Sequence, residues 1–383
     1  MSKSAIVAIG YNRPDCMKRL LDSLKDAVYL SKVDLIISID YSGSNSVEEI
    51  ANDFIWSHGE KRVIHHSERL GLKKHVLSCG SFTQDYDYIV VFEDDLYVSK
   101  YFFDFVEKSV DKYKSDTQIA GIGLYSYDFV QNVGFPFTPI ADGYDVFFLQ
   151  QACSLGQIWI KDKWDEFYKW YLKNSESFQD LKYLPANINR WDEKSWLKYY
   201  NRYCVEKDKF FVYPRTSLVT DWSPIGSHAK TSSNKFQLPL LYGEKDYKLP
   251  SLQESRSVYD AFYENMGLGV YLGLESSELC VDTYGGKTNS YGKRYWLTTK
   301  ELDYKVIRSF GLTLRPRDAN IINPVDGEYF FLYDTSEKET KKTKKHNGDD
   351  FEIEYVLRDL SIKKVWHYCN REMLRRFKRR LKK

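Results

Sequence analysis

Three adjacent acids, Glu93, Asp94 and Asp95, form the group of side chains that most clearly indicates chemistry in this chain. They follow residues 89–92, a short apolar run with two valines that predicts a strand buried on both faces. In open α/β sheets, ligands bind at the carboxyl ends of such strands. Because neighbouring carboxylates repel one another, a divalent cation would stabilise them, and hard carboxylate oxygens suit Mg²⁺ or Mn²⁺. The alternative is a strand that ends in a solvated acidic turn.

The composition excludes several classes of protein. At 383 residues the chain exceeds one average domain, so we expect a main domain and a smaller one. The net charge of +2 gives no field that would attract nucleic acid. The six cysteines lack the spacing of a zinc site, which favours free thiols in a reducing compartment. We find no signal peptide and no run of about 18 apolar residues, so we expect a cytoplasmic protein without a membrane span.

Short apolar strands alternate with helices around the acidic triplet. The expected strands cover residues 5–9, 35–39, 63–64, 89–92, 119–125, 147–149 and 210–213. The expected helices begin at Asp15 and Ser46 and cover residues 72–79 and 101–113. Strands that alternate with helices in this way predict an α/β fold with a mostly parallel sheet and right-handed crossovers.

Such a sheet suggests a nucleotide, but the usual phosphate loops are missing from the sequence. No G-x-G-x-x-G follows the first strand, and no G-x-x-x-x-G-K-[ST] occurs anywhere. If a nucleotide binds, a metal ion held by the acidic triplet must therefore hold its diphosphate.

Changes in composition divide the chain into four expected parts. Residues 1–235 form the main domain, and residues 236–335, rich in Gly and Tyr, form an appended subdomain. Residues 336–350 are polar and rich in lysine, as in a linker, and residues 351–383 form a helix.

The last part of this helix is amphipathic and basic. Its apolar face comprises Ile362, Val365, Trp366, Cys369, Met373, Phe377 and Leu381. Its final thirteen residues contain eight Lys or Arg and one Glu. This pattern favours binding of residues 361–383 to an anionic membrane surface, at the inner face of the membrane. The alternative is a helix that packs on its own protein and leaves a solvated basic edge.

The order of these motifs resembles that of a GT-A glycosyltransferase, in particular the bacterial relatives of the N-acetylglucosaminyltransferase I group. The matching pieces are residues 5–14, 38–43, 73–75, 91–96, 154–157, 190–192 and 226–228. The resemblance spans roughly residues 4–235 and implies a Rossmann-like GT-A fold with helices on both sides of the sheet. The C-terminal third lies outside it.

The resemblance implies a role for each acid of the triplet. Asp95 would ligate Mn²⁺ or Mg²⁺, and the diphosphate of a nucleotide-sugar donor would supply further oxygens. Asp94 would reach the ribose or the transferred sugar, and Glu93 the sugar hydroxyls. Asn12 and Arg13 would face the nucleotide or its diphosphate; the alternative for Arg13 is a solvated surface arginine.

Three more residues are assigned to the donor by this resemblance. Asp40 would accept a hydrogen bond from the base, which favours uracil; the alternative is a turn aspartate bonded to Ser42 or Gly43. His75 would lie beside the nucleotide, unless it is a structural histidine of its helix. His228 lies in a Gly/Ser loop like the one that orders over the donor; the alternative is an exposed loop histidine.

Asp192 matches the region of the catalytic base, which removes the proton of the acceptor hydroxyl in an inverting transfer. Neighbouring aromatic residues would desolvate it and raise its pKa. Glu193 is the second candidate for the base. The alternative role for Asp192 is N-capping of the following helix.

Together these motifs predict a metal-dependent inverting glycosyltransferase that moves a sugar from a UDP-sugar to a hydroxyl of a glycan. The basic tail suggests a lipid-linked glycan acceptor, as in bacterial cell-surface polysaccharide synthesis. The non-enzyme alternative is a nucleotide- or carbohydrate-binding protein on a GT-A scaffold. A sugar-nucleotide pyrophosphorylase would need a glycine-rich basic loop after the first strand, which residues 10–14 do not form.

Overall fold

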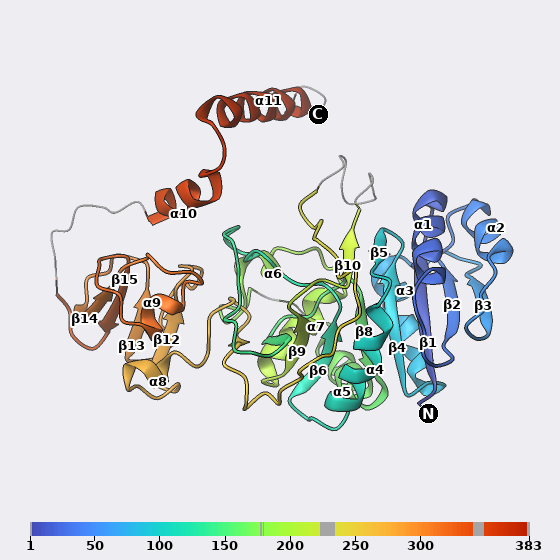
Figure 1. Cartoon of the computed structure of the whole chain (residues 1–383), viewed down its shortest axis with the longest axis horizontal. Coiled ribbons are helices and arrows are strands. Elements are labelled where there is room, and N and C mark those ends of the chain that lie inside the picture. Colours follow the sequence, from blue (N-terminus) through green and yellow to red (C-terminus); the bar gives the residue numbers. More distant parts are fainter. Residues whose placement is uncertain (1, 177, 179, 223–233, 340–347, 381–383) are drawn as a thin grey trace.

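The computed structural model describes residues 2–176, 178, 180–222, 234–339 and 348–380. A nine-stranded sheet runs through the larger part of the molecule (Figure 1). In spatial order its strands are β11 (Val258–Tyr259), β7 (Val146–Leu149), β9 (Phe210–Pro214), β6 (Ile119–Gly123), β8 (Gln157–Ile160), β4 (Tyr88–Glu93), β1 (Ser4–Gly10), β2 (Asp34–Ile39) and β3 (Lys61–His65).

The first four strands confirm the expected parallel α/β arrangement. β1 lies between β4 and β2, β3 pairs with β2, and all of these pairs are parallel. The side chains of β1, β2 and β4 are mostly apolar and almost completely buried, as expected for strands covered on both faces, whereas the edge strand β3 is only partly buried. Because β1 and β4 are in register, Ile9 lies opposite Glu93, and the loop after β1 begins next to the acidic triplet.

Helices cover both faces of this sheet. α1 (Pro14–Lys25) and α2 (Ser46–Asp53) connect neighbouring strands in one direction and pack against each other. The chain then returns from β3 to β4 through α3 (Leu72–Cys79) and the 3₁₀ helix η1 (Gly80–Gln84), so a right-handed crossover places α3 on the other face. The remaining helices of this domain are α4 (Phe102–Tyr113), α5 (Lys161–Asn174), α6 (Ala186–Asn189) and α7 (Leu197–Glu206).

The first domain extends further along the chain than the composition suggests. β11, at residues 258–259, joins the large sheet beside β7, and Leu252 and Tyr263 belong to the main apolar core. The second core begins at Leu268. The boundary expected at residue 235 is therefore too early, because residues 236–267 run along the first domain and complete its sheet.

The second sheet is small and has four strands. In spatial order they are β12 (Leu279–Asp282), β13 (Tyr295–Thr298), β15 (Phe330–Asp334) and β14 (Lys305–Phe310), with the short helices α8 (Gly269–Leu272) and α9 (Ala319–Ile322). The expected appended subdomain therefore exists, but it begins later than expected.

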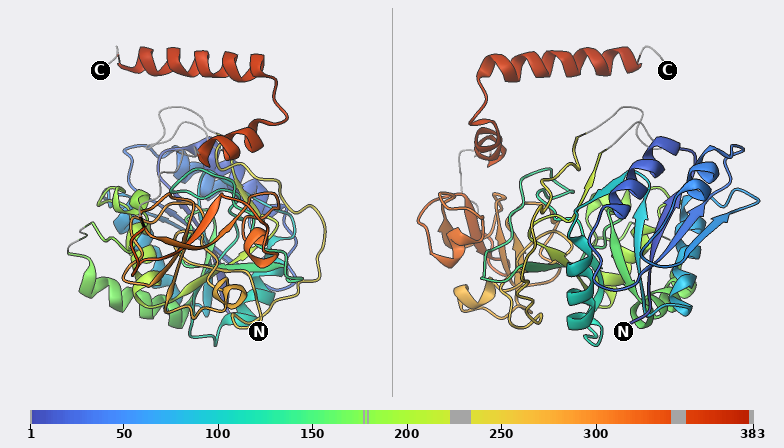
Figure 2. Two further views of the ribbon diagram at one scale, coloured as in Figure 1. Left: turned by 90° about the vertical axis from the view of Figure 1, so that its left-hand side faces the viewer. Right: turned by 45° about the vertical axis from the view of Figure 1, so that its right-hand side comes forward.

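The C-terminal segment forms two helices rather than one. α10 (Gly348–Leu357) contacts the second domain through Glu352, which pairs with Arg315 and Arg317 in the segment between β14 and α9. α11 (Ile362–Arg380) stands clear of the other ribbons in both views of Figure 2. Its apolar side chains are open to solvent; Trp366 is 67% exposed and Phe377 62%. No helix in the described ranges is long and apolar enough to cross a membrane.

The apolar face of α11 is therefore not packed on the described part of its own protein. Leu381, which was expected on that face, lies outside the described residues, as does much of the expected linker. All six cysteines are unpaired, and all except Cys369 are buried, which confirms the expectation of free thiols.

Candidate active site

The acidic triplet lies at the carboxyl end of β4, as the sequence predicts. Glu93 is the last residue of β4, and Asp94 and Asp95 form a turn into a short strand, β5 (Leu96–Val98). Arg13, from the loop after β1, donates from Nη2 to Asp95 Oδ2 at 3.0 Å and from Nε to Asp94 Oδ2 at 3.3 Å. It also donates from Nη2 to Asp94 Oδ1. One guanidinium group therefore holds two of the three acids.

This guanidinium does not offset all of the negative charge. Burial, and then the charges of Asp95 and Asp94, raise the pKa of Glu93 to about 8. Burial also raises the pKa of Asp94 to about 6, against the opposing effect of Arg13. Such shifts are typical of functional sites, where like charges are held together. The cluster would therefore be stabilised by a second cation.

A fourth acid, Asp221, lies beside the triplet. It is the last residue of β10 (Val219–Asp221), which pairs with β5 so that Asp221 lies opposite Leu96. Asp221 is 8% exposed. Its charge also raises the pKa of Glu93, by less than burial and the charges of Asp95 and Asp94 do. Sequence reasoning missed Asp221, because only the pairing of β5 with β10 brings it to this site.

The chemistry of these groups fits a divalent cation that is completed by a ligand. Among the residues that the structure describes, no group of three or more His, Cys, Asp or Glu is arranged to hold a metal ion by itself. Both oxygens of Asp94 bond to Arg13, whereas the Asp95 side chain remains 26% exposed. Asp95 is therefore the acid best placed to bind a cation whose other ligands come from a bound molecule. His228 lies outside the described residues.

Asp40 follows β2 and is almost completely buried. Its Oδ1 accepts from the Leu70 N–H at 2.7 Å, and its Oδ2 accepts from the Gly71 N–H at 2.9 Å. Asp40 therefore does not form the alternative turn with Ser42 or Gly43. It fixes the loop that begins α3, and its contact with a base stays a prediction.

His75 lies inside α3 and contacts β2. Its Nε2 lies 2.8 Å from Ser38 Oγ, and its ring meets that of His66 edge-on with centroids 5.1 Å apart. Burial lowers the pKa of His75 to about 4, so the ring is neutral at physiological pH. These contacts give His75 a structural role, and its contact with a nucleotide stays a prediction.

Aromatic rings follow the ends of the same parallel strands. Tyr41, just after β2, is 44% exposed and stacks on His65 at the end of β3, with centroids 6.3 Å apart. Tyr11, just after β1, lies under Arg69, whose guanidinium is 4.9 Å from the ring centre. Sequence reasoning did not identify these rings, although their places directly after the strands were a usable signal. Asn12, between Tyr11 and Arg13, is exposed.

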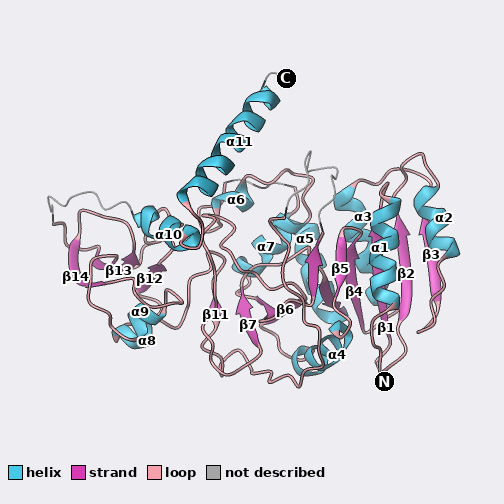
Figure 3. Ribbon diagram, turned by 45° about the horizontal axis from the view of Figure 1, so that its top comes forward, coloured by secondary structure: helices cyan, strands magenta, loops and turns pink. Residues whose placement is uncertain are grey.

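The predicted acceptor-side residues lie in the loop between α6 and α7. Asp192 is exposed, and its Oδ1 accepts from the Lys194 N–H at 2.8 Å. α7 is preceded by Trp196, so Asp192 does not cap this helix. The expected shielding of Asp192 by aromatic residues is wrong, because the residue lies at the surface. Figure 3 shows α6, which leads into this loop, toward the upper side of the molecule, as is α3.

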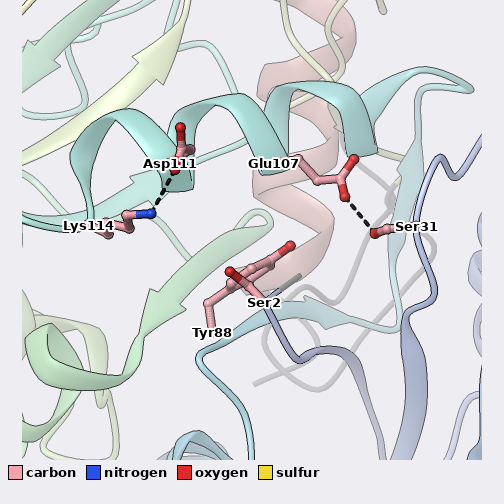
Figure 4. Close-up of a pocket in the computed structure, with 6 residues that line it drawn as sticks. All are labelled: Ser2, Ser31, Tyr88, Glu107, Asp111 and Lys114. Atoms are coloured by element: carbon pink, nitrogen blue, oxygen red, sulfur yellow. Dashed lines mark hydrogen bonds and ion pairs between the residues drawn. The ribbon is translucent and has the colours of Figure 1, made fainter.

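A small cavity lies at the opposite edge of the sheet and is not part of this site. It has a volume of about 130 Å³ and is lined by Ser2, Ser31, Tyr88, Glu107, Asp111 and Lys114 (Figure 4). Tyr88 begins β4, whereas the acidic triplet ends it. Two of the lining contacts already pair polar groups, Ser31 with Glu107 and Lys114 with Asp111.

Comparisons with known proteins give one family match and several weak structural similarities. Residues 5–155 match the family model described as Glycosyl transferase family 2. The structure of S. aureus TarS 1-349 in complex with UDP-GlcNAc has a TM-score of 0.39 and 12% identity, over 60% of this chain and 61% of that chain. The structure described as S. aureus TarS has a TM-score of 0.34 and 13% identity, over 57% of this chain and 36% of that chain.

The mannosyltransferase PcManGT from Pyrobaculum calidifontis, in complex with GDP-Man and Mn²⁺, has a TM-score of 0.30 and 11% identity, over 42% of this chain and 45% of that chain. This chain therefore spans less than two thirds of the length of each of these structures. A comparison with curated protein sequences gives no match.

The first testable prediction concerns the buried neutral ring of His75. An unfolded histidine has a pKa of 6.5 and folded His75 one of about 4, so the unfolded chain takes up the proton first as the pH falls. The stabilising contribution is complete above pH 6.5 and is lost between pH 6.5 and pH 4. It amounts to on the order of 3 kcal/mol. In His75→Gln this part of the pH dependence should disappear.

Urea unfolding of both proteins at pH 7 and pH 4 measures this difference. His367→Gln, which changes an exposed histidine of α11, should keep the pH dependence of the unmodified protein. Equal pH dependence in His75→Gln and the unmodified protein would show that His75 does not stay neutral in the folded state.

Proposed function

We propose that this chain, a glycosyltransferase with a GT-A fold whose residues 5–155 match family 2, transfers a sugar from a cation-held UDP-sugar to a hydroxyl of a glycan. The observation that carries the proposal is the acidic triplet at the end of β4, in which Arg13 binds Asp94 and Asp95. A site with more negative than positive charge favours a divalent cation, and through it a diphosphate.

Asp95 would hold Mn²⁺ or Mg²⁺, and such a cation, when bound, neutralises the charge that develops on a leaving diphosphate. Arg13 adds a second positive charge at the same place and suits the phosphate oxygens. Glu93, at the end of β4, would form a hydrogen bond with a hydroxyl of the transferred sugar. Asp94 would accept a hydrogen bond from the ribose or the sugar.

The nucleotide would lie along the ends of β1, β2 and β3. The exposed ring of Tyr41 and the neighbouring Tyr11 offer faces on which a base can stack. Asp40 accepts from the N–H groups of Leu70 and Tyr41 at Oδ1 and of Gly71 at Oδ2, and the second lone pair of Oδ2 would accept from the N3–H of uracil. This arrangement favours UDP as the nucleotide of the donor.

Asp192 would act as the base of a single in-line displacement. The acceptor oxygen forms a bond to the anomeric carbon while the bond to the diphosphate breaks, and the hydroxyl proton passes to Asp192. One displacement of this kind inverts the anomeric configuration. The exposed carboxylate of Asp192 is accessible to a large acceptor, as a glycan hydroxyl requires.

The tail supports an acceptor that is linked to a lipid. α11 has a basic sequence and exposed apolar side chains, which match an anionic membrane surface in charge and hydrophobicity. Figure 1 places α11 on the side of the large sheet toward which β10 points. Binding of α11 to the inner face of a bacterial membrane would bring the site to lipid-linked glycans of cell-surface polysaccharide synthesis.

The second prediction tests the cation. Asp95→Ala should abolish the Mn²⁺-dependent part of UDP binding, because this acid supplies the exposed carboxylate of the triplet. Isothermal titration calorimetry with UDP, with and without Mn²⁺, measures the effect. Asp111→Ala, at the opposite edge of the sheet, is the matched control and should bind normally. Unchanged Mn²⁺-dependent affinity in Asp95→Ala would remove the metal assignment.

The third prediction tests the base. Asp192→Asn should keep UDP binding but lower kcat by a factor on the order of 10² or more, since it removes the proton acceptor. Steady-state transfer assays and calorimetry separate the two effects. Asp53→Asn, at the exposed end of α2, is the control. Normal turnover in Asp192→Asn would exclude this residue as the base. If the unmodified protein binds UDP but transfers no sugar, it is a binding protein and not an enzyme.

The fourth prediction tests the membrane surface. The full chain should float with vesicles that contain phosphatidylserine, and deletion of residues 361–383 should abolish flotation. A variant with Trp366→Ser, Met373→Ser and Phe377→Ser keeps the charge of α11 and should bind only weakly, because apolar contacts are lost. A full-length protein that stays at the bottom of the gradient at low salt would refute this part of the proposal.

A further inference from the structure

The loop that carries Asp192 is held by a buried lysine. Lys198 is the second residue of α7, and its side chain is 1% exposed. Its Nζ donates to the Trp191 carbonyl oxygen at 2.9 Å and to Glu193 Oε1 at 3.0 Å. One ammonium group therefore binds the residues on both sides of Asp192.

This place is unfavourable for a lysine. Burial of an ammonium group costs free energy that its partners must offset. A positive charge in the first turn of a helix also opposes the helix dipole, which favours anions there. The ring of Phe178, whose centre lies 4.0 Å from Nζ, and the two oxygens of the loop compensate for these costs. A methionine would fill this space without a charge, so the contacts with the loop are what the lysine adds.

Glu193 has both carboxylate oxygens occupied. Oε1 accepts from Lys198, and Oε2 accepts from the Tyr199 hydroxyl at 2.9 Å. The hydrogen bond from Lys198 is the main cause that lowers the pKa of Glu193. A carboxylate held as an anion by two donors is a weaker base than one with a free oxygen. Glu193 therefore suits an anchor better than it suits proton removal.

Asp192 keeps one oxygen available in the same loop. Its Oδ1 accepts from the Lys194 N–H, and its main-chain oxygen accepts from the Ser195 N–H at 2.9 Å. Within the described ranges, Oδ2 takes part in no hydrogen bond, and the residue is exposed. The backbone is thus fixed on both sides while one carboxylate oxygen faces solvent, from which an acceptor hydroxyl arrives.

We infer that Lys198 is a positioning residue for the transfer reaction, and that Lys198, Glu193 and Tyr199 form a clamp that holds Asp192 in place as the base. This inference rests on the proposed function, since it concerns the base of the same reaction. It also assigns different roles to the two residues that the sequence offers as the catalytic base: Asp192 takes the proton, and Glu193 fixes the loop.

The clamp also touches the donor side of the site. Lys73 of α3 lies with Nζ 5.0 Å from the centre of the Tyr199 ring, and its charge helps to lower the pKa of Glu193 after the bonds from Lys198 and Tyr199. α3 begins at the loop held by Asp40. α3, which follows the loop held by Asp40, thus contacts Tyr199 of the clamp. The donor side and the acceptor side of the proposed site are therefore packed against each other.

The experiment compares two buried lysines. Lys198→Met removes the clamp charge, whereas Lys163→Met removes another buried lysine, which lies in the first turn of α5 and donates to the Asp116 carbonyl oxygen. For each variant, kcat, the KM for a UDP-sugar, UDP affinity by calorimetry and Tm are measured. Lys198→Met should lose at least tenfold in kcat with donor KM and UDP affinity within twofold, and Lys163→Met should change Tm alone.

Three further variants decide the roles. Lys198→Arg, which keeps a cation at this place, should recover part of the lost kcat. Glu193→Gln should lose less than tenfold, because its amide oxygen still accepts from Lys198, whereas Asp192→Asn should lose on the order of 10² or more. Tyr199→Phe removes one hydroxyl and should lower kcat severalfold; it provides the test if Lys198→Met does not fold.

The outcomes separate the inference from the proposed function. If Asp192→Asn is inactive but Lys198→Met and Tyr199→Phe keep the kcat of the Lys163→Met control, the clamp is refuted and the base remains. If Glu193→Gln is as inactive as Asp192→Asn, the division of roles is wrong. If Asp192→Asn turns over normally, the proposed base fails, and the clamp fails with it.

Discussion

The close approach of negative charges at the end of β4 is the constraint on which this site depends. Glu93, Asp94 and Asp95 leave a buried strand together, and Asp221 joins them from β10. Arg13 is the cation that meets two of them in the described structure. A fold tolerates such crowding only where a partner relieves it. Burial and the charges of Asp95 and Asp94 raise the pKa of Glu93 in spite of Arg13, so a further cation at this place would be stabilising.

The fold brings these groups together through two different kinds of contact. Arg13 and the triplet meet because β1 and β4 are parallel neighbours, so that their carboxyl ends share one edge. Asp221 arrives by the antiparallel ribbon of β5 and β10, which joins the triplet to a segment more than a hundred residues later. The first contact follows from the parallel pairing of β1 and β4. The second depends on the pairing of two strands that lie far apart in the sequence.

The same difference explains what could be predicted from the sequence. The apolar runs around residues 5–9, 35–39 and 89–92 are local patterns, and the structure confirms them as β1, β2 and β4. The role of Asp221 could not be found, because it depends on distant pairing. β11 has only two residues, in a polar stretch, so the sequence gives no sign that it joins the large sheet. The change in composition near Phe236 therefore marks a segment that runs along the first domain, and not the end of that domain. Lys198 likewise looks like a surface lysine until α7 and its loop are seen together.

Two carboxylates of the site, each next to a cation, reach opposite states. Glu93 ends a buried strand beside Asp94 and Asp95, which share one guanidinium group, and its pKa rises to about 8, chiefly through burial. Glu193 lies at the surface with its own ammonium and hydroxyl donors, and its pKa is lowered, chiefly by Lys198. Burial thus favours the protonated form of Glu93, and the two donors favour the anionic form of Glu193. Asp192 differs from both: its backbone is held by hydrogen bonds, and one of its carboxylate oxygens is exposed.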